Sequence, residues 1–159
     1  MSTQSFFQAL QNSELAISIG QSNHLYGALA QLFHIAGLVF ILAPVLLVNL
    51  RLLGTGLTNQ PISLLVKATN PFIYVGLVSI ILSGVFMVLP SAALYYPNPA
   101  FWLKFQLLGL ALVVQFTLYR KVTATENPHR LLAIVTAIIS LTLWFGVGIA
   151  GRAIGYLAA

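Results

Sequence analysis

The feature that most constrains this chain is its first apolar stretch, from Leu25 to Leu50. It is longer than the roughly 20 residues that a helix needs to cross a bilayer. Arg51 ends the stretch, and His34 lies inside it, about 14 Å from its beginning at 1.5 Å per residue. Ionisable side chains at such a depth are rare and mark functional sites by default. The stretch therefore predicts a membrane protein and makes His34 its first candidate functional residue.

The composition of the whole chain agrees with a lipid environment. Of the 159 residues, 59% are hydrophobic and only 6% are charged, whereas soluble domains carry about 25% charged residues. The net charge of +5 comes from bases scattered at the ends of apolar runs, which gives no face for nucleic acid. Because the chain has no cysteine, thiolate catalysis and cysteine-bound metals or Fe–S clusters are excluded.

We predict an all-α fold, a four-transmembrane-helix bundle that forms a single domain over residues 1–159. The first residues place Phe6, Leu10 and Ile17 at helical spacing, which indicates a short amphipathic helix in the membrane interface. The predicted elements are that helix at 3–18 and spans at about 24–50, 71–94, 99–119 and 128–157.

Asparagine-proline pairs precede the last three predicted spans. Asparagine is a favoured N-cap, and proline is favoured at the first helical position. The pairs are Asn70-Pro71, Asn98-Pro99 and Asn127-Pro128.

The basic residues predict the orientation of the bundle. The first and third connections carry Arg51, Lys67, Arg120, Lys121 and Arg130, and only Lys104 and Arg152 lie toward the other end. Connections rich in Lys and Arg face the cytoplasm. We therefore expect a multi-pass protein of the bacterial inner membrane with both termini in the periplasm.

Two further cations are expected in the same half of the membrane as His34. Lys104 lies five residues into the third predicted span, and Arg152 lies about five residues before the end of the fourth. They either reach the interface as long side chains near helix ends or hold the negative groups of a ligand. Ala30 and Gly37 share a helix face with His34, and small residues there admit either another helix or a flat macrocycle.

The leading hypothesis is a b-type haem protein of membrane electron transfer. His34 would be an axial ligand of haem b, Lys104 and Arg152 would pair with the propionates, and Met87 is a candidate second ligand. The alternatives are a structural or accessory subunit of a larger membrane complex or homo-oligomer, and a quinone or lipid-anion site without haem. No acidic residue lies in any predicted span, which argues against Ca²⁺ or Mg²⁺ and against carboxylate proton relays.

The sequence resembles a family of small, functionally uncharacterised bacterial membrane proteins with four spans. The matching features are His34 with Ile-Ala-Gly-Leu after it, the run Leu50-Arg51-Leu52-Leu53-Gly54, the Phe101-x-x-Lys104 pair, and the run from Gly151 to Tyr156. The resemblance implies the fold and the location but no activity. An acid is usual in that family where Gln21 and Asn49 stand here. More loosely, the layout is similar to four-helix membrane b-type cytochromes.

Overall fold

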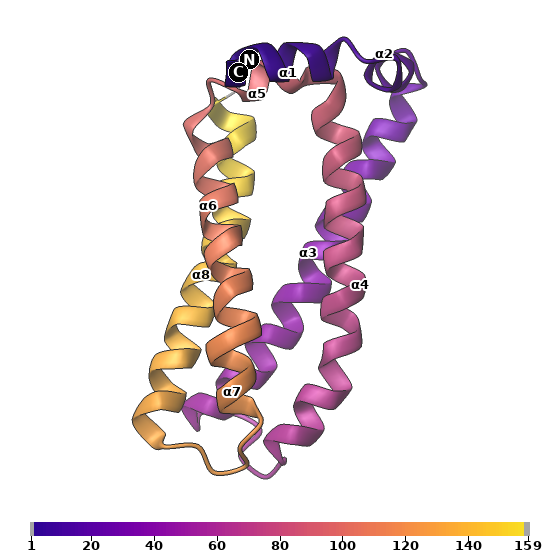
Figure 1. Cartoon of the computed structure of the whole chain (residues 1–159). Coiled ribbons are helices and arrows are strands. Elements are labelled where there is room, and N and C mark those ends of the chain that lie inside the picture. The colour runs from indigo at the N-terminus through magenta and orange to yellow at the C-terminus, as the bar shows by residue number, and fades with distance from the viewer. Residues whose placement is uncertain (1, 158–159) are drawn as a thin grey trace.

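The computed structural model describes residues 2–157, and it is helical throughout its regular elements. Four helical stretches are long and apolar enough to cross a membrane, as the sequence predicted. Helices α1 and α2 lie across the end of the bundle where α3 begins and α8 ends (Figure 1). The elements are α1 (Thr3–Gln11), α2 (Glu14–Gly20), α3 (His24–Leu53), α4 (Ile62–Val88), η1 (Leu89–Ser91), α5 (Ala92–Tyr95), α6 (Pro99–Val114), η2 (Gln115–Tyr119, a π-helical turn), α7 (Arg120–Thr123) and α8 (Arg130–Leu157).

The end that carries α1 is called the α1 end here, and the end that carries the α3–α4 and α7–α8 connections is called the basic end. Helix α3 packs along α4, α6 packs along α8, and α3 also contacts α8 (Figure 1). The outer surface of the bundle is apolar, as a lipid-facing surface requires. Side chains that keep about half or more of their surface exposed include Leu32, Phe33, Leu82, Val113 and Ile149.

Two buried apolar clusters hold the spans together. The central cluster joins all four spans through Ile41, Val45, Ile73, Ile80, Ala111, Trp144 and Val147. The second cluster lies toward the basic end and consists of Val48, Leu52, Ile62, Tyr119, Val122, Ala133 and Ala137. Apart from the indole N–H of Trp144, which donates to Gln115, the central cluster is apolar.

Helices α3 and α4 approach most closely at Gly37 and Gly76. A Cβ added at Gly76 would lie 2.6 Å from the Gly37 carbonyl oxygen, and one added at Gly37 would lie 2.8 Å from Cγ2 of Ile80. Neither position has room for a methyl group. The small residues near His34 thus serve a close helix–helix contact at Gly37, and α4 occupies the face that a macrocycle would need there.

The structure differs from the sequence prediction at several boundaries. Span two begins at Ile62, nine residues before the predicted start, and Pro71 lies inside α4. The predicted helix 3–18 is two helices, because Ser13 caps a new one by accepting from the Ala16 amide. The Asn98-Pro99 start is confirmed: Asn98 Oδ1 accepts from the amides of Ala100 and Phe101.

Candidate functional site

A chain of polar contacts crosses the bundle at His34. The imidazole Nδ1 lies 2.9 Å from Oγ of Ser83 on α4, and Nε2 lies 3.2 Å from Nζ of Lys104 on α6. The Ser83 hydroxyl donates to the Ser79 carbonyl at 2.5 Å, and the Ser79 hydroxyl donates to the Phe33 carbonyl at 2.8 Å. Side chains from three different spans therefore meet at one imidazole.

The direction of these hydrogen bonds fixes the tautomer of His34. The single Ser83 proton is used on the Ser79 carbonyl, so Oγ of Ser83 accepts from His34 and Nδ1 carries the hydrogen. Nε2 then has a free lone pair, which accepts from Lys104. The imidazole is neutral in this arrangement, and among the described residues Lys104 is its one side-chain donor.

Glycines on two helices make room for the pair. A Cβ on Gly84 of α4 would lie 3.4 Å from Cε1 of His34, and a Cβ on Gly151 of α8 would lie 3.5 Å from Nζ of Lys104. Larger side chains at either position would press on the imidazole or on the amine. Through Gly151 the fourth span also borders the site, so every span contributes to it.

The cation at this site has no acidic partner in the spans. The chain has two acidic residues; Glu14 begins α2, and Glu126 lies in the α7–α8 connection. Lys104 is half-buried, and its one hydrogen bond to a described side chain is to His34. An ammonium group has three N–H donors, so two of them remain for a ligand.

The other predicted ligand residues make no hydrogen bond to His34 or Lys104 within residues 2–157. Arg152 is exposed, and its guanidinium lies 5.4 Å from the centre of the Tyr156 ring, one helical turn away. Met87 lines a cavity that His34 does not line. Ala30 is buried at 8% exposure, and Gly37 is packed against α4. Of the predicted residues, only Lys104 is thus brought onto His34.

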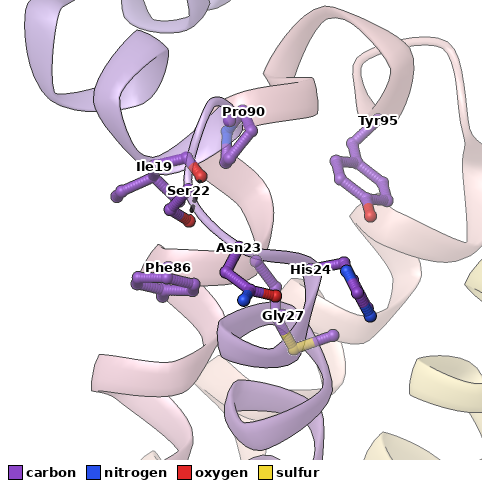
Figure 2. Close-up of a pocket in the computed structure, with 10 residues that line it drawn as sticks. Ile19, Ser22, Asn23, His24, Gly27, Phe86, Pro90 and Tyr95 are labelled. Atoms are coloured by element: carbon purple, nitrogen blue, oxygen red, sulfur yellow. Dashed lines mark hydrogen bonds between the residues drawn. The ribbon is translucent and has the colours of Figure 1, made fainter.

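The cavity that holds Met87 lies at the α1 end, where α2, α3 and the end of α4 meet. Its volume is about 310 Å³. Figure 2 shows His24, Asn23, Phe86 and Tyr95 around it. Gly27 also lines this cavity, and it lies seven residues before His34 on the same face of α3, or about 10 Å away. His24 and Met87 are therefore neighbours of one cavity rather than part of the His34 chain.

A second polar layer lies in the basic half, and sequence reasoning missed it. The fully buried Asn49 donates to Ser140 of α8 at 3.1 Å, and its Oδ1 has no protein partner. Trp144, also buried, donates to Oε1 of Gln115 at 3.3 Å. Polar residues inside predicted spans were the available signal, because Asn49, Gln115 and Ser140 each interrupt an apolar run.

Comparison with known proteins gives a family but no activity. The chain belongs to DUF6644, a family of unknown function whose model matches residues 6–157. This confirms the predicted resemblance to an uncharacterised family. No curated protein and no solved structure matches the chain, so the looser similarity to b-type cytochromes has no support among them.

Proposed function

We propose that this protein binds the oxygen of a lipid-soluble ligand, namely the carbonyl of a quinone, at Lys104 and His34, and serves membrane electron transfer in that way. The observation that carries the proposal is the contact between Nζ of Lys104 and Nε2 of His34 in a bundle without acidic residues in its spans. A lysine kept away from water and from any carboxylate is costly. An oxygen acceptor supplied by a ligand would offset that cost.

The depth of the site favours a quinone over a phospholipid headgroup. Helix α3 has 30 residues, which corresponds to about 45 Å. Centred in a hydrocarbon core of about 30 Å, such a helix holds His34 about 7 Å inside the core. Phospholipid phosphates stay in the interface, whereas a quinone headgroup on an apolar tail can enter from the bilayer. Its carbonyl is an acceptor for the free donors of Lys104.

The orientation of the bundle belongs to the same proposal. The first and third connections carry most of the basic residues, and the positive-inside rule places them in the cytoplasm of a bacterial inner membrane. Lys104 and His34 would then face the periplasmic half of the membrane.

The ligand content of the purified protein tests the proposal. We expect organic extracts of the wild-type protein to contain quinone, and Lys104→Met to reduce its amount about tenfold, as loss of a charged hydrogen bond of roughly 1.4 kcal/mol would do. Arg130→Gln, an exposed cation at the other end of the bundle, is the matched control and should retain the wild-type content. Extracts without quinone, together with no binding of added quinone, would contradict the proposal.

Haem b is the second candidate, and one observation favours it. Metal-binding imidazoles use one nitrogen on the metal and donate from the other, and Nδ1 of His34 donates to Ser83. Nε2 is engaged by Lys104, however, so the residues as they stand do not present a free axial donor. Haem would supply one-electron chemistry. Its binding would require the Lys104 amine to exchange its contact with Nε2 of His34 for one with a haem propionate.

An absorption spectrum distinguishes the two candidates. A haem protein purified from haem-replete cells would show a Soret band that His34→Ala abolishes while the protein remains in the membrane. A colourless preparation that contains quinone would exclude haem and support the quinone site.

A further inference from the structure

A second cavity, of about 190 Å³, lies toward the basic end between α4 and the η2–α7 segment. It is separate from the His34 site, because α4 contributes residues 66–74 to it and Ser83 to the other. Its lining mixes polar and apolar side chains: Val66, Asn70, Ile73, Tyr74, Gln115, Phe116, Tyr119, Arg120 and Thr123.

The polar side of this cavity is held in place by the bundle interior. Gln115 lines the inner part of the cavity, is only 7% exposed, and its Oε1 accepts from Trp144 at 3.3 Å. The side chains of Gln115 and Tyr119 belong to the π-helical turn η2, a feature that is frequent at functional sites. The inner wall of the cavity is thereby held in place by a contact between α8 and the η2 turn.

The charge at this cavity is positive, and within residues 2–157 no acidic side chain lines it. Arg120 lines it and is exposed. The acidic residue of the neighbouring connection, Glu126, is bound to the amides of Ile62 and Ser63 at 3.2 and 3.3 Å. A guanidinium with the side-chain amide of Asn70 on the same cavity is a site for an anion that has several acceptor oxygens, above all a phosphate.

The apolar side of the cavity indicates where the phosphate comes from. Tyr74 and Phe116 both line the cavity and keep 54% and 48% of their surface exposed on the outside of the bundle. A free phosphate would make no apolar contact with these two rings, whereas the first carbons of an acyl chain would cover them. Basic pockets between spans at the headgroup level are suited to anionic lipids.

We infer that this cavity binds the headgroup phosphate of an anionic phospholipid from the leaflet at the basic end. Arg120 pairs with the phosphate, the side-chain amide of Asn70 donates to it, and an acyl chain runs along Tyr74 and Phe116. The inference is independent of the quinone proposal, since it uses none of the same residues.

Native mass spectrometry of the full chain from nanodiscs of equal phosphatidylglycerol and phosphatidylcholine tests this inference. We expect the wild type to retain phosphatidylglycerol preferentially and Arg120→Gln to reduce that preference about fivefold, as loss of one cation at the membrane surface would. Lys121→Gln is the matched control, because Lys121 is the next residue, equally basic and exposed, and does not line the cavity. Its preference should stay within twofold of the wild type.

Asn70→Leu supplies a second variant of unchanged charge, and it should also lower phosphatidylglycerol retention while phosphatidylcholine retention stays the same. Equal losses in Arg120→Gln and Lys121→Gln would show a diffuse surface charge and overturn the inference. Equal competition by soluble glycerol phosphate at matched phosphate concentration would overturn the lipid assignment. If the wild type shows no preference for phosphatidylglycerol over phosphatidylcholine, both the anion site and its assignment to a lipid are wrong.

Discussion

At the residue scale, the His34 chain depends on each member having a partner. Ser83 is 6% exposed, and it both accepts from Nδ1 of His34 and donates to the Ser79 carbonyl. Buried polar side chains inside membranes are retained when such partners exist. These hydrogen bonds therefore hold the imidazole so that Nε2 faces Lys104. The proposed ligand site requires this arrangement.

Replacing Ser83 with alanine tests this dependence. The change leaves the Nδ1 hydrogen of His34 without its acceptor and should lower the free energy of unfolding by about 1 kcal/mol. Thr117→Ala is the control, because Thr117 is exposed and donates only to Val113 of its own helix; its effect should be below about 0.5 kcal/mol. Reversible unfolding in mixed detergent micelles measures both. Equal effects of the two substitutions would show that the Ser83 contact carries no special weight.

The sequence predicted the members of this site better than their contacts. His34 and Lys104 were both predicted from their depth in apolar spans, which is a property of the sequence. Their direct contact depends on the distance between α3 and α6 and on the direction of a long lysine side chain. For the same reason Arg152 was expected beside them but lies on Tyr156, one turn along α8.

At the element scale, the α3–α4 pair is held by the close approach of Gly37 and Gly76. Gly76→Ala should lower the free energy of unfolding by about 1–3 kcal/mol, because its Cβ would overlap the Gly37 carbonyl and the backbones would have to separate. Gly109→Ala in α6 is the matched control. Nothing lies within 4 Å of its added Cβ, so removing a helical glycine should be neutral or stabilise by up to about 1 kcal/mol. Destabilisation by Gly109→Ala as large as that by Gly76→Ala would refute the contact.

The boundaries of α4 show where local sequence signals are overridden. Asn98-Pro99 begins α6 because a tight connection precedes it, and Asn98 there caps two amides. Asn70-Pro71 is the same dipeptide, but it lies inside α4, which begins at Ile62. Ile62 is 2% exposed in the basic-end cluster, and that burial outweighs the local preference of the pair. Periodicity and caps alone could not show this tertiary contact.

Glu126 fixes the beginning of α4 from the neighbouring connection. Hydrogen bonding from the Ser63 side chain, the amides of Ser63 and Ile62, and the charge of Arg51 lower the pKa of Glu126. A lowered pKa in the folded state means that the carboxylate stabilises the protein above the ordinary value of 4.5 and loses this effect as the pH falls through the lowered value.

Glu126→Gln should therefore lower the melting temperature slightly at pH 7, because an exposed contact is screened by solvent. The difference from the wild type should disappear as the pH falls below 4.5. Differential scanning fluorimetry over a pH series measures it. A difference that persists unchanged at the lowest pH would show that the charge of Glu126 is not involved.

At the scale of the whole molecule, the bundle has a basic end and an α1 end that carries no cluster of bases. The positive-inside rule places the basic connections in the cytoplasm. Fusions of alkaline phosphatase after Ala159 should then be active, and fusions in the α3–α4 connection should be inactive. Green fluorescent protein at the same sites should give the reverse pattern. A cytoplasmic C-terminus would reverse the orientation and place Lys104 and His34 in the inner half of the membrane.

The four spans and their order follow from apolar length alone, which is why the sequence predicted the fold of the whole chain. The division of the interior could not be predicted in that way. It depends on which side chains of each helix face inward. The apolar residues around Ile41 and Val45 lie between the hydrogen bonds of His34 and the contact between Asn49 and Ser140.

The most direct test of the central claim is a thermal titration of the purified protein with a short-chain quinone. Ligand that binds only the folded state raises the melting temperature with concentration. Wild-type protein and Arg130→Gln should show the same saturable rise, and Lys104→Met and His34→Ala should need about tenfold more quinone for it. The same titration curve for Lys104→Met and for the wild type, or no saturable rise in the wild type, would contradict the assignment of Lys104 and His34 as the ligand site.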